Sequence, residues 1–425
     1  MNTYQQQIDA KASALIAKWG IPNVAAVMVR DHGNTVLSTA KGVRDASQSA
    51  SLASNQVDTS DYFNVGSISK PIFGMLLACL IKQGLLDWTT TIGQVFPEFT
   101  SPAFRARCGM NTNFLDTKLF ELTAHTSGID GWLFFVEDGN SKDPNQAGEV
   151  ADPFKWIDDW TILGSTGSNP RDVEWQNLQS VMYRRYLYTV TSLKQPKFIF
   201  NSLHNNGFQN TESSGYGSSA VIAAAMVERR AGKPFEQLMT ELLASTIPMQ
   251  IRYGPPPNGM QLHNWANGKY VVWMQGNKPF ANGPFASFQP KFLTGTISCT
   301  VQGMAQFIRY NLNVLANLAM FDLAAYHQQV TSPAPTGGTV ATNVTQGGLA
   351  LSLGQTANEP YWHNGQLGGT NAWMEVYPSA GHGLAVMVNA DGGPDPTGST
   401  DPPDGAEAAM NELRDELRAL NASWP

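Results

Sequence analysis

The sequence predicts an α+β fold in which one antiparallel sheet is assembled from both ends of the chain. Two short apolar or alternating segments follow a helical segment near the start, and two more precede a helical segment near the end. The long stretch between them is irregular and rich in loops. We therefore expect a core domain formed by residues 1–85 and 290–425, with residues 86–289 inserted as a mainly helical and loop-rich lobe.

The first elements are marked by the spacing of their apolar residues. Residues 4–19 carry apolar side chains at helical spacing and stop before Gly20. Residues 24–29 and 35–40 are apolar or alternating runs on either side of a polar turn at 31–34. We predict a helix followed by an antiparallel pair of strands.

A second helix is predicted from Ser67 to about Gln83, where Gly84 ends it, and it begins with the tetrad Ser67-Ile-Ser-Lys70. Three residues are just under one helical turn, so the Ser67 hydroxyl and the Lys70 amine project from the same face. The helix N-terminus adds free backbone N–H groups and partial positive charge beside the hydroxyl. A serine placed in this way has a proton acceptor and part of an oxyanion hole, as a nucleophile requires.

The tetrad alone does not identify a nucleophile, because so short a pattern also arises by chance and serine is a common residue at helix starts. The chain contains a second copy, Ser38 to Lys41, at the end of the predicted strand 35–40. Residues three apart on a strand face opposite sides, so this second pair cannot cooperate. The assignment of Ser67 therefore depends on the rest of the chain.

The later elements follow the same two periodicities. Helices are predicted at 218–230, 235–245 and 304–315, strands at 373–377 and 383–389, and a last helix, with one apolar stripe, after the loop 391–405. The strands near the C-terminus have the length and alternation of partners for the strands near the N-terminus. This match is the basis for a single sheet built from both ends.

Composition excludes several classes of function. The net charge is −7 and only 14% of the residues are charged, with no basic run, so neither nucleic acid nor an anionic membrane is an expected partner. No apolar stretch approaches the roughly 20 residues of a membrane-spanning helix. The first residues lack the basic and apolar regions of a signal peptide, so we expect a cytoplasmic protein.

No cofactor or metal ion is expected from the motifs. The three cysteines are too few for a disulfide scaffold, and the seven histidines form no His-x-His or His-Glu-x-x-His pattern. A phosphate-binding glycine loop is absent from the sequence, as is the Gly-x-Ser-x-Gly pattern of a nucleophile elbow.

Several landmarks occur in the order found in one superfamily. Besides Ser67 and Lys70, the segment Leu122-Thr-Ala-His-Thr-Ser-Gly-Ile129 resembles a Leu-Thr-His-Thr-Ser-Gly-Leu turn, and Gly295–Thr300 precedes a helix. On these motifs the chain resembles the serine β-lactamase and penicillin-binding-protein superfamily over nearly its whole length. The branch it most resembles holds class C β-lactamases, D-aminopeptidases, family VIII carboxylesterases and acyltransferases. The resemblance implies a β-lactamase/transpeptidase-like fold and an acyl-enzyme mechanism on Ser67.

The resemblance also implies a catalytic tyrosine. Tyr216-Gly-Ser-Ser219, followed by an alanine-rich helix, resembles the Tyr-Ser-x-x motif of the esterases, whereas Ser218 stands where the β-lactamases have asparagine. A phenol touching both Lys70 and Ser67 would have a lowered pKa and would carry the serine proton. Alternatively, Tyr216 only caps the helix. Tyr186 and Tyr188 are rivals without the helix pattern.

The third motif of the superfamily, Lys-Thr-Gly, has its counterpart in His363-Asn-Gly365. By analogy, Gly365 would let an acyl group lie flat along the strand, and the N–H of Gln366 would complete the oxyanion hole with that of Ser67. Replacement of lysine by His363 removes a permanent cation, which disfavours substrates with a carboxylate. His363 as a structural strand residue is the alternative reading.

We therefore expect a serine hydrolase that acts on a small-molecule ester or amide, first of all a carboxylesterase for short or medium acyl esters. Trp132 and other aromatic residues of the insertion would line an apolar acyl pocket, or else pack its loops. The alternatives are a D-amino-acid amidase or D-aminopeptidase, a weak β-lactamase, and an inactive binding protein of the same fold. An amidase needs an acid that meets the substrate amine, and Asp130, Glu137 and Glu375 are undistinguished candidates. The sequence makes no prediction of oligomeric state.

Overall fold

The computed structural model describes most of the two ends of the chain and parts of its middle. The described residues are 3–108, 112–123, 127, 182, 185–186, 189, 218–246, 249–253, 256, 260–274, 293–295, 297–316, 360–393 and 405–423.

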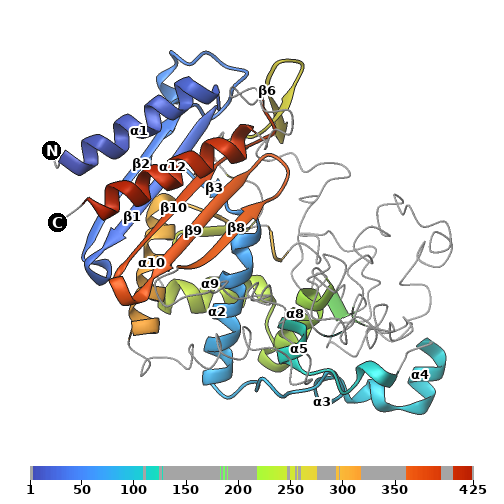
Figure 1. Cartoon of the computed structure of the whole chain (residues 1–425). Coiled ribbons are helices and arrows are strands. Elements are labelled where there is room, and N and C mark those ends of the chain that lie inside the picture. Colours follow the sequence, from blue (N-terminus) through green and yellow to red (C-terminus); the bar gives the residue numbers. More distant parts are fainter. Residues whose placement is uncertain are drawn as a thin grey trace, which may run out of the picture.

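The main sheet joins the two ends of the chain (Figure 1). Its five strands lie in the order β2-β1-β10-β9-β8, and each pair of neighbours is antiparallel. The strands are β1 Asn23–Arg30, β2 Thr35–Gly42, β8 Tyr361–Gln366, β9 Asn371–Tyr377 and β10 His382–Val388. Strand β1 pairs with β2 on one side and with β10 on the other, which confirms the sheet predicted from both ends.

The alternation of apolar side chains along β1 creates two hydrophobic cores. Ala25, Val27 and Val29 belong to the core on one face of the sheet, whereas Val24 and the residues that alternate with it belong to the other. A strand of this kind is buried on both faces, so it requires a helical layer on each side.

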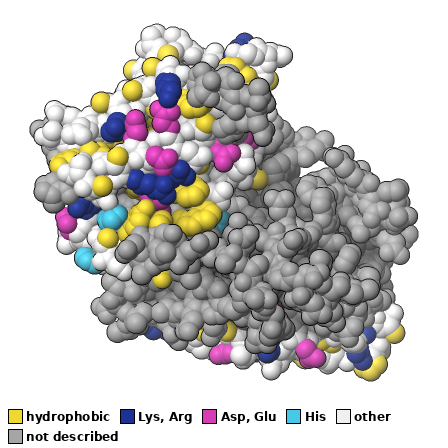
Figure 2. Space-filling model, in the orientation of Figure 1, with side chains coloured by type: hydrophobic (Ala, Val, Ile, Leu, Met, Phe, Trp, Pro, Cys, Tyr) yellow, Lys and Arg dark blue, Asp and Glu magenta, His cyan; other side chains and the backbone are white. Residues whose placement is uncertain are grey.

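Helices α1, Thr3–Trp19, and α12, Gly405–Ala422, form one layer and lie side by side across the sheet (Figure 1). Lys18 Nζ and Trp19 Nε1 both donate to Glu412 Oε2, over 2.7 and 2.9 Å. These bonds connect the two terminal helices to each other. Figure 2 shows Lys and Arg side chains mixed with Asp and Glu side chains on the face turned to the viewer.

The opposite face is covered by helices α2, Ser69–Lys82, and α10, Val301–Ala316. Helix α2 is apolar nearly all round and almost wholly buried, so it passes through the larger core. The remaining described helices are α3 Ile92–Val95, α4 Pro102–Cys108, α5 Leu119–Thr123, α8 Ser218–Ala231 and α9 Phe235–Thr246. The helices predicted around these positions at 4–19, 218–230, 235–245 and 304–315 are confirmed to within a few residues.

Two small sheets were not predicted in full. One consists of β3 Phe63–Asn64, β7 Ile297–Cys299 and β4 Ile251–Tyr253, and the other of β11 Ala390–Asp391, β5 Leu262–Ala266 and β6 Lys269–Met274. Strands β4, β5 and β6 lie in the segment that we expected to be mainly helical and rich in loops. They pair with strands of the expected core, β4 with β7 and β5 with β11. The division into a core domain and an insertion stays a prediction.

None of the helices within the described ranges is both long enough and apolar enough to cross a membrane.

Candidate active site

Ser67 and Lys70 lie together at the start of α2. The predicted helix begins slightly later than expected, because Gly66–Ile68 form a 3₁₀ turn that places Ser67 just before the α-helix. Lys70 Nζ donates to Ser67 Oγ over 2.6 Å. The competing pair is separated as predicted: Ser38 and Lys41 lie on β2, and the amine of Lys41 pairs with Asp9 over 3.5 Å.

Burial changes the acid–base properties of Lys70. Its side chain is 0% exposed, and burial lowers the pKa of the amine well below the ordinary value of 10.5. Desolvation disfavours the charged ammonium form. In the neutral form the same contact allows the amine to accept the proton of Ser67, whose side chain is only partly buried.

The turn before Ser67 lies directly against strand β8. Gly66 has a φ of +49°, and a Cβ at this position would lie 2.7 Å from the backbone nitrogen of Gln366. In return, a Cβ on Gly365 would lie 2.9 Å from the backbone nitrogen of Ser67. Both positions therefore require glycine. The backbone N–H groups of Ser67 and Gln366 are contributed by two adjoining segments, an arrangement able to hold an oxyanion.

His363 faces the same side of the sheet as the Ser67 turn. On β8 it pairs with Met374 of β9, and cross-strand partners share a face; Met374 belongs to the core that contains α2. Burial, and to a smaller extent the ammonium form of nearby Lys70, lowers the pKa of the imidazole to about 3. His363 is therefore uncharged at neutral pH and provides no cation for a substrate carboxylate.

Two residues considered for the site belong to packing instead. Tyr186 is buried in the core, with its ring 5.7 Å from that of Phe96 and 5.5 Å from that of Phe99. The carboxylate of Glu375 lies on the opposite face of the sheet, where it accepts hydrogen bonds from Arg418 of α12, at 2.9 and 2.6 Å, and from Trp373 and Tyr377. Tyr186 therefore lies among aromatic rings of the core, and Glu375 is not placed to meet a substrate amine.

The other predicted site residues, Tyr216 and Trp132, lie outside the described residues, as do Tyr188, Asp130 and Glu137. Their neighbours show one relevant contact. Ser127 Oγ and Ser219 Oγ are hydrogen-bonded at 2.9 Å, and both side chains are buried. The contact joins the Leu122–Ile129 segment to the start of α8, three residues after Tyr216.

Three buried polar residues that the sequence did not indicate support the turn around Gly66. Asn64, Thr370 and Asn389 are buried polar residues whose side chains bind the backbone around Gly66 and the end of β10. A buried amide requires partners, but the sequence alone gives no signal of where those partners lie. Among the described residues no cluster of three or more histidine, cysteine or acidic side chains could hold a metal ion.

Comparison with known proteins gives a consistent result. A family model described as Beta-lactamase matches residues 8–171 and 204–408. No curated protein matches the chain significantly. Among solved structures, a D-amino acid amidase from Ochrobactrum anthropi SV3 complexed with L-phenylalanine is 16% identical with a TM-score of 0.58, the match covering 98% of this chain and 99% of that one.

Two further structures are similar at the same low level of identity. The octameric penicillin-binding protein homologue from Pyrococcus abyssi is 14% identical, with a TM-score of 0.57 over 98% of this chain and 78% of that one. A D-stereospecific amidohydrolase from Streptomyces sp. is 14% identical, with a TM-score of 0.52 over 91% and 93%. These likenesses concern the fold, whereas the family model covers most of the sequence. The chain belongs to the β-lactamase family and has its β-lactamase/transpeptidase-like fold.

Proposed function

We propose that this β-lactamase-family hydrolase acts through an acyl-enzyme formed on Ser67. The observation that carries the proposal is the 2.6 Å contact between Ser67 Oγ and the amine of Lys70, which is fully buried and has a lowered pKa. A neutral amine at this distance takes the proton of Ser67 while the serine oxygen attacks the substrate carbonyl.

The negative charge that develops on the carbonyl oxygen is held by the backbone N–H groups of Ser67 and Gln366. The leaving alcohol or amine then takes a proton from Lys70, directly or through the phenol of Tyr216. Water or another alcohol attacks the acyl-enzyme in the same way and releases the acyl group. The role of Tyr216 in this reaction, as a proton carrier between Lys70 and the leaving group, is assigned from its sequence motif.

We propose uncharged esters with short or medium acyl chains as the substrates, which makes the protein a carboxylesterase. A neutral His363 at the position of the superfamily's lysine supports this choice, because a substrate carboxylate would find no cation there. An ester also has a better leaving group than an amide and needs less assistance from protonation. An apolar acyl pocket that includes Trp132 remains part of this proposal.

A D-amino-acid amide is the second candidate substrate. It is favoured by the likeness to structures described as a D-amino acid amidase and a D-stereospecific amidohydrolase. Such a substrate carries an α-amine, which requires an acid or carbonyl oxygens close to Ser67. Glu375 does not serve, since its carboxylate binds Arg418 on the other face of the sheet.

The deciding experiment measures initial rates of p-nitrophenyl butyrate hydrolysis by the wild type, Ser67→Ala and Ser38→Ala. Ser38 is a matched control because it heads the second Ser-x-x-Lys copy. The proposal expects hydrolysis that disappears in Ser67→Ala and persists in Ser38→Ala. If Ser67→Ala hydrolyses the ester as fast as the wild type, Ser67 is not the nucleophile. Turnover of D-phenylalanine amide, with no ester hydrolysis, would favour the second candidate, and no turnover of either would favour a binding protein.

A further inference from the structure

Asn64 lies two residues before Gly66 and is fully buried at the end of β3. Its side-chain oxygen accepts a hydrogen bond from the backbone N–H of Gly66 over 3.0 Å. Its side-chain nitrogen donates to the carbonyl oxygens of Gly295 and Ile297 over 3.3 and 3.2 Å. The amide thus holds the Ser67 turn on one side and the strand β7 region on the other.

Hydrogen bonds also fix the backbone of Asn64. Its N–H donates to Asn389 Oδ1 over 3.1 Å, and its carbonyl accepts a hydrogen bond of 2.6 Å from Thr370 Oγ1. Thr370 Oγ1 also lies 3.2 Å from the carbonyl of Val388, the last residue of β10. Asn64 is therefore fixed to the end of the main sheet.

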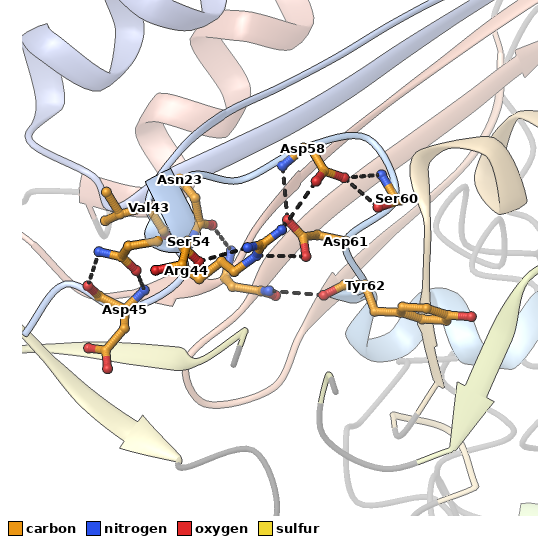
Figure 3. A network of polar contacts seen from close by, with 11 residues as sticks. Asn23, Val43, Arg44, Asp45, Ser54, Asp58, Ser60, Asp61 and Tyr62 are labelled. Carbon is orange, nitrogen blue, oxygen red and sulfur yellow. Dashed lines mark hydrogen bonds and ion pairs between the residues drawn. The ribbon is translucent and has the colours of Figure 1, made fainter. Parts of the chain in front are cut away.

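Asn389 extends this attachment to the segment before the turn. Its side-chain nitrogen donates to the carbonyl of Tyr62 over 3.4 Å, and its backbone N–H donates to Asn23 Oδ1 over 3.0 Å. On the other side of this segment Arg44 lies against Asp58 and Asp61, as Figure 3 shows, with Nε–Oδ distances to Asp61 of 2.9 and 3.0 Å. Residues 58–64 therefore approach the turn along a fixed path.

The bond from Asn64 sets the orientation of one particular peptide group. The Val65–Gly66 peptide has its N–H bound by Asn64 and its carbonyl packed against Gly365, and the same carbonyl accepts from Ile68 N over 3.1 Å. Because the next peptide carries the Ser67 N–H, rotation of the Val65–Gly66 plane would turn that N–H away from its position beside Gln366.

We propose that Asn64 is a positioning residue for the oxyanion hole: through Gly66 it aims the Ser67 N–H, and Asn389 and Thr370 hold it in place. The inference rests on the proposed function of Ser67. Only an amide serves here, because the site needs one acceptor toward Gly66 and two donors toward carbonyl oxygens. A carboxylate would keep the acceptor but would set a negative oxygen against the carbonyls of Gly295 and Ile297.

The test is Asn64→Asp, with Asn55→Asp as a matched control. Asn55 is buried and has the same set of bonds elsewhere: its oxygen accepts from Asp45 N, and its nitrogen donates to the carbonyls of Asp45 and Ser49. Each variant is measured for melting temperature, fraction of Ser67 labelled by a fluorophosphonate, kcat and KM on p-nitrophenyl butyrate, and inhibition by butylboronic acid. The boronic acid forms a tetrahedral adduct that places an oxygen in the oxyanion hole.

We expect Asn64→Asp to lose about tenfold to 100-fold in kcat per labelled site, with little change in KM and a similar loss of boronic acid affinity. Asn55→Asp should lose thermal stability but keep kcat and boronic acid affinity. If Asn64→Asp does not fold, Thr370→Val is tested instead, because it removes the bond to the Asn64 carbonyl. We expect it to lower kcat and boronic acid affinity in the same way but by a smaller factor.

Three results would overturn the inference. These are a kcat of the folded variant within about twofold of the wild type, a loss of kcat explained by fewer labelled sites, and an equal loss in Asn55→Asp. If the wild type neither turns over esters nor labels at Ser67, the proposed function itself fails, and the inference with it. An active wild type with a normal Asn64→Asp would remove the inference alone.

Discussion

The carbonyl oxygen of Val65 lies 2.0 Å from the position that a Cβ of Gly365 would occupy. No side chain fits there, so Gly365→Ala would push strand β8 away from the Ser67 turn and separate the two oxyanion N–H groups. We expect a loss of about 100-fold in kcat, measured on p-nitrophenyl butyrate. Gly42→Ala is the control, since its Cβ would lie 2.2 Å from Pro22 O: it should lower the melting temperature without this loss of kcat.

Removal of the Lys70 amine tests the proton acceptor. Lys70→Ala should lower kcat by about 10²–10⁴ because Ser67 would lose its base. Lys41→Ala, in the second tetrad, should leave the rate unchanged. In the wild type, activity should rise with pH as Lys70 loses its proton, and the midpoint should lie well below 10.5 because burial lowers the pKa of this amine. A normal rate for Lys70→Ala would remove the residue from the mechanism.

Tyr216→Phe tests the proton carrier that the motif predicts. It should also lower kcat by about 10²–10⁴ while the melting temperature stays close to that of the wild type. The comparison is Tyr186→Phe, which alters a tyrosine packed between aromatic rings and should change stability rather than rate. Equal rates for Tyr216→Phe and the wild type would mean that this tyrosine only caps a helix.

His363→Lys tests the basis for the choice of substrate. A cation at this position should favour a substrate that ends in a carboxylate. We therefore compare kcat/KM for mono-p-nitrophenyl succinate with that for p-nitrophenyl butyrate. The ratio should rise about tenfold or more in the variant, through a lower KM for the succinate. An unchanged ratio would show that residue 363 does not meet the substrate.

His263 makes stability depend on pH. The ring is buried; Nδ1 lies 2.8 Å from Asn389 O, and Nε2 accepts from Ala46 N over 3.1 Å. Burial lowers its pKa in the folded protein below 6.5. At a pH below 6.5 the unfolded chain therefore binds a proton on this residue more readily than the folded protein does. The free energy of unfolding should therefore fall as pH drops below about 6.5, by at most ~1.4 kcal/mol per pH unit for this group.

Urea unfolding at pH 7 and pH 5 measures this effect. His363 and His382 also have lowered pKa values, so they contribute in the same direction. His263→Gln should be less stable at pH 7 and lose less on acidification than the wild type. An identical pH dependence in the variant would exclude a contribution from His263.

Most of the scaffold follows from local patterns in the sequence. The two faces of β1 and the apolar helix after Ser67 are periodic signals, and the Ser67–Lys70 contact follows from helix geometry. The hairpin β5–β6 was missed although it carries a recognisable signal: Asn267 and Gly268 have φ values of +52° and +77° in its turn. Asn-Gly between two alternating runs is typical of such hairpins.

The support of the site could not be predicted in the same way. Asn64 and Asn389 are separated by more than three hundred residues, yet one donates directly to the other. Nothing local distinguishes them from other asparagines, because the requirement for an amide arises from backbone groups that only the fold brings together. The same holds for Glu375, whose carboxylate was a candidate for substrate binding until Arg418 was seen to bind it.

The order of strands in the main sheet also bears on when the protein becomes active during its synthesis. Ser67, Lys70 and strand β2 on one side of β1 emerge from the ribosome early, whereas Gln366 and strand β10 on the other side of β1 emerge late. Until then the nascent chain carries Ser67 and Lys70 without Gln366, the proposed second oxyanion donor, and β1 has one open edge. Such an edge is a site for aggregation. The strand order of this chain therefore leaves the proposed site incomplete, and one edge of β1 unpaired, until synthesis is nearly finished.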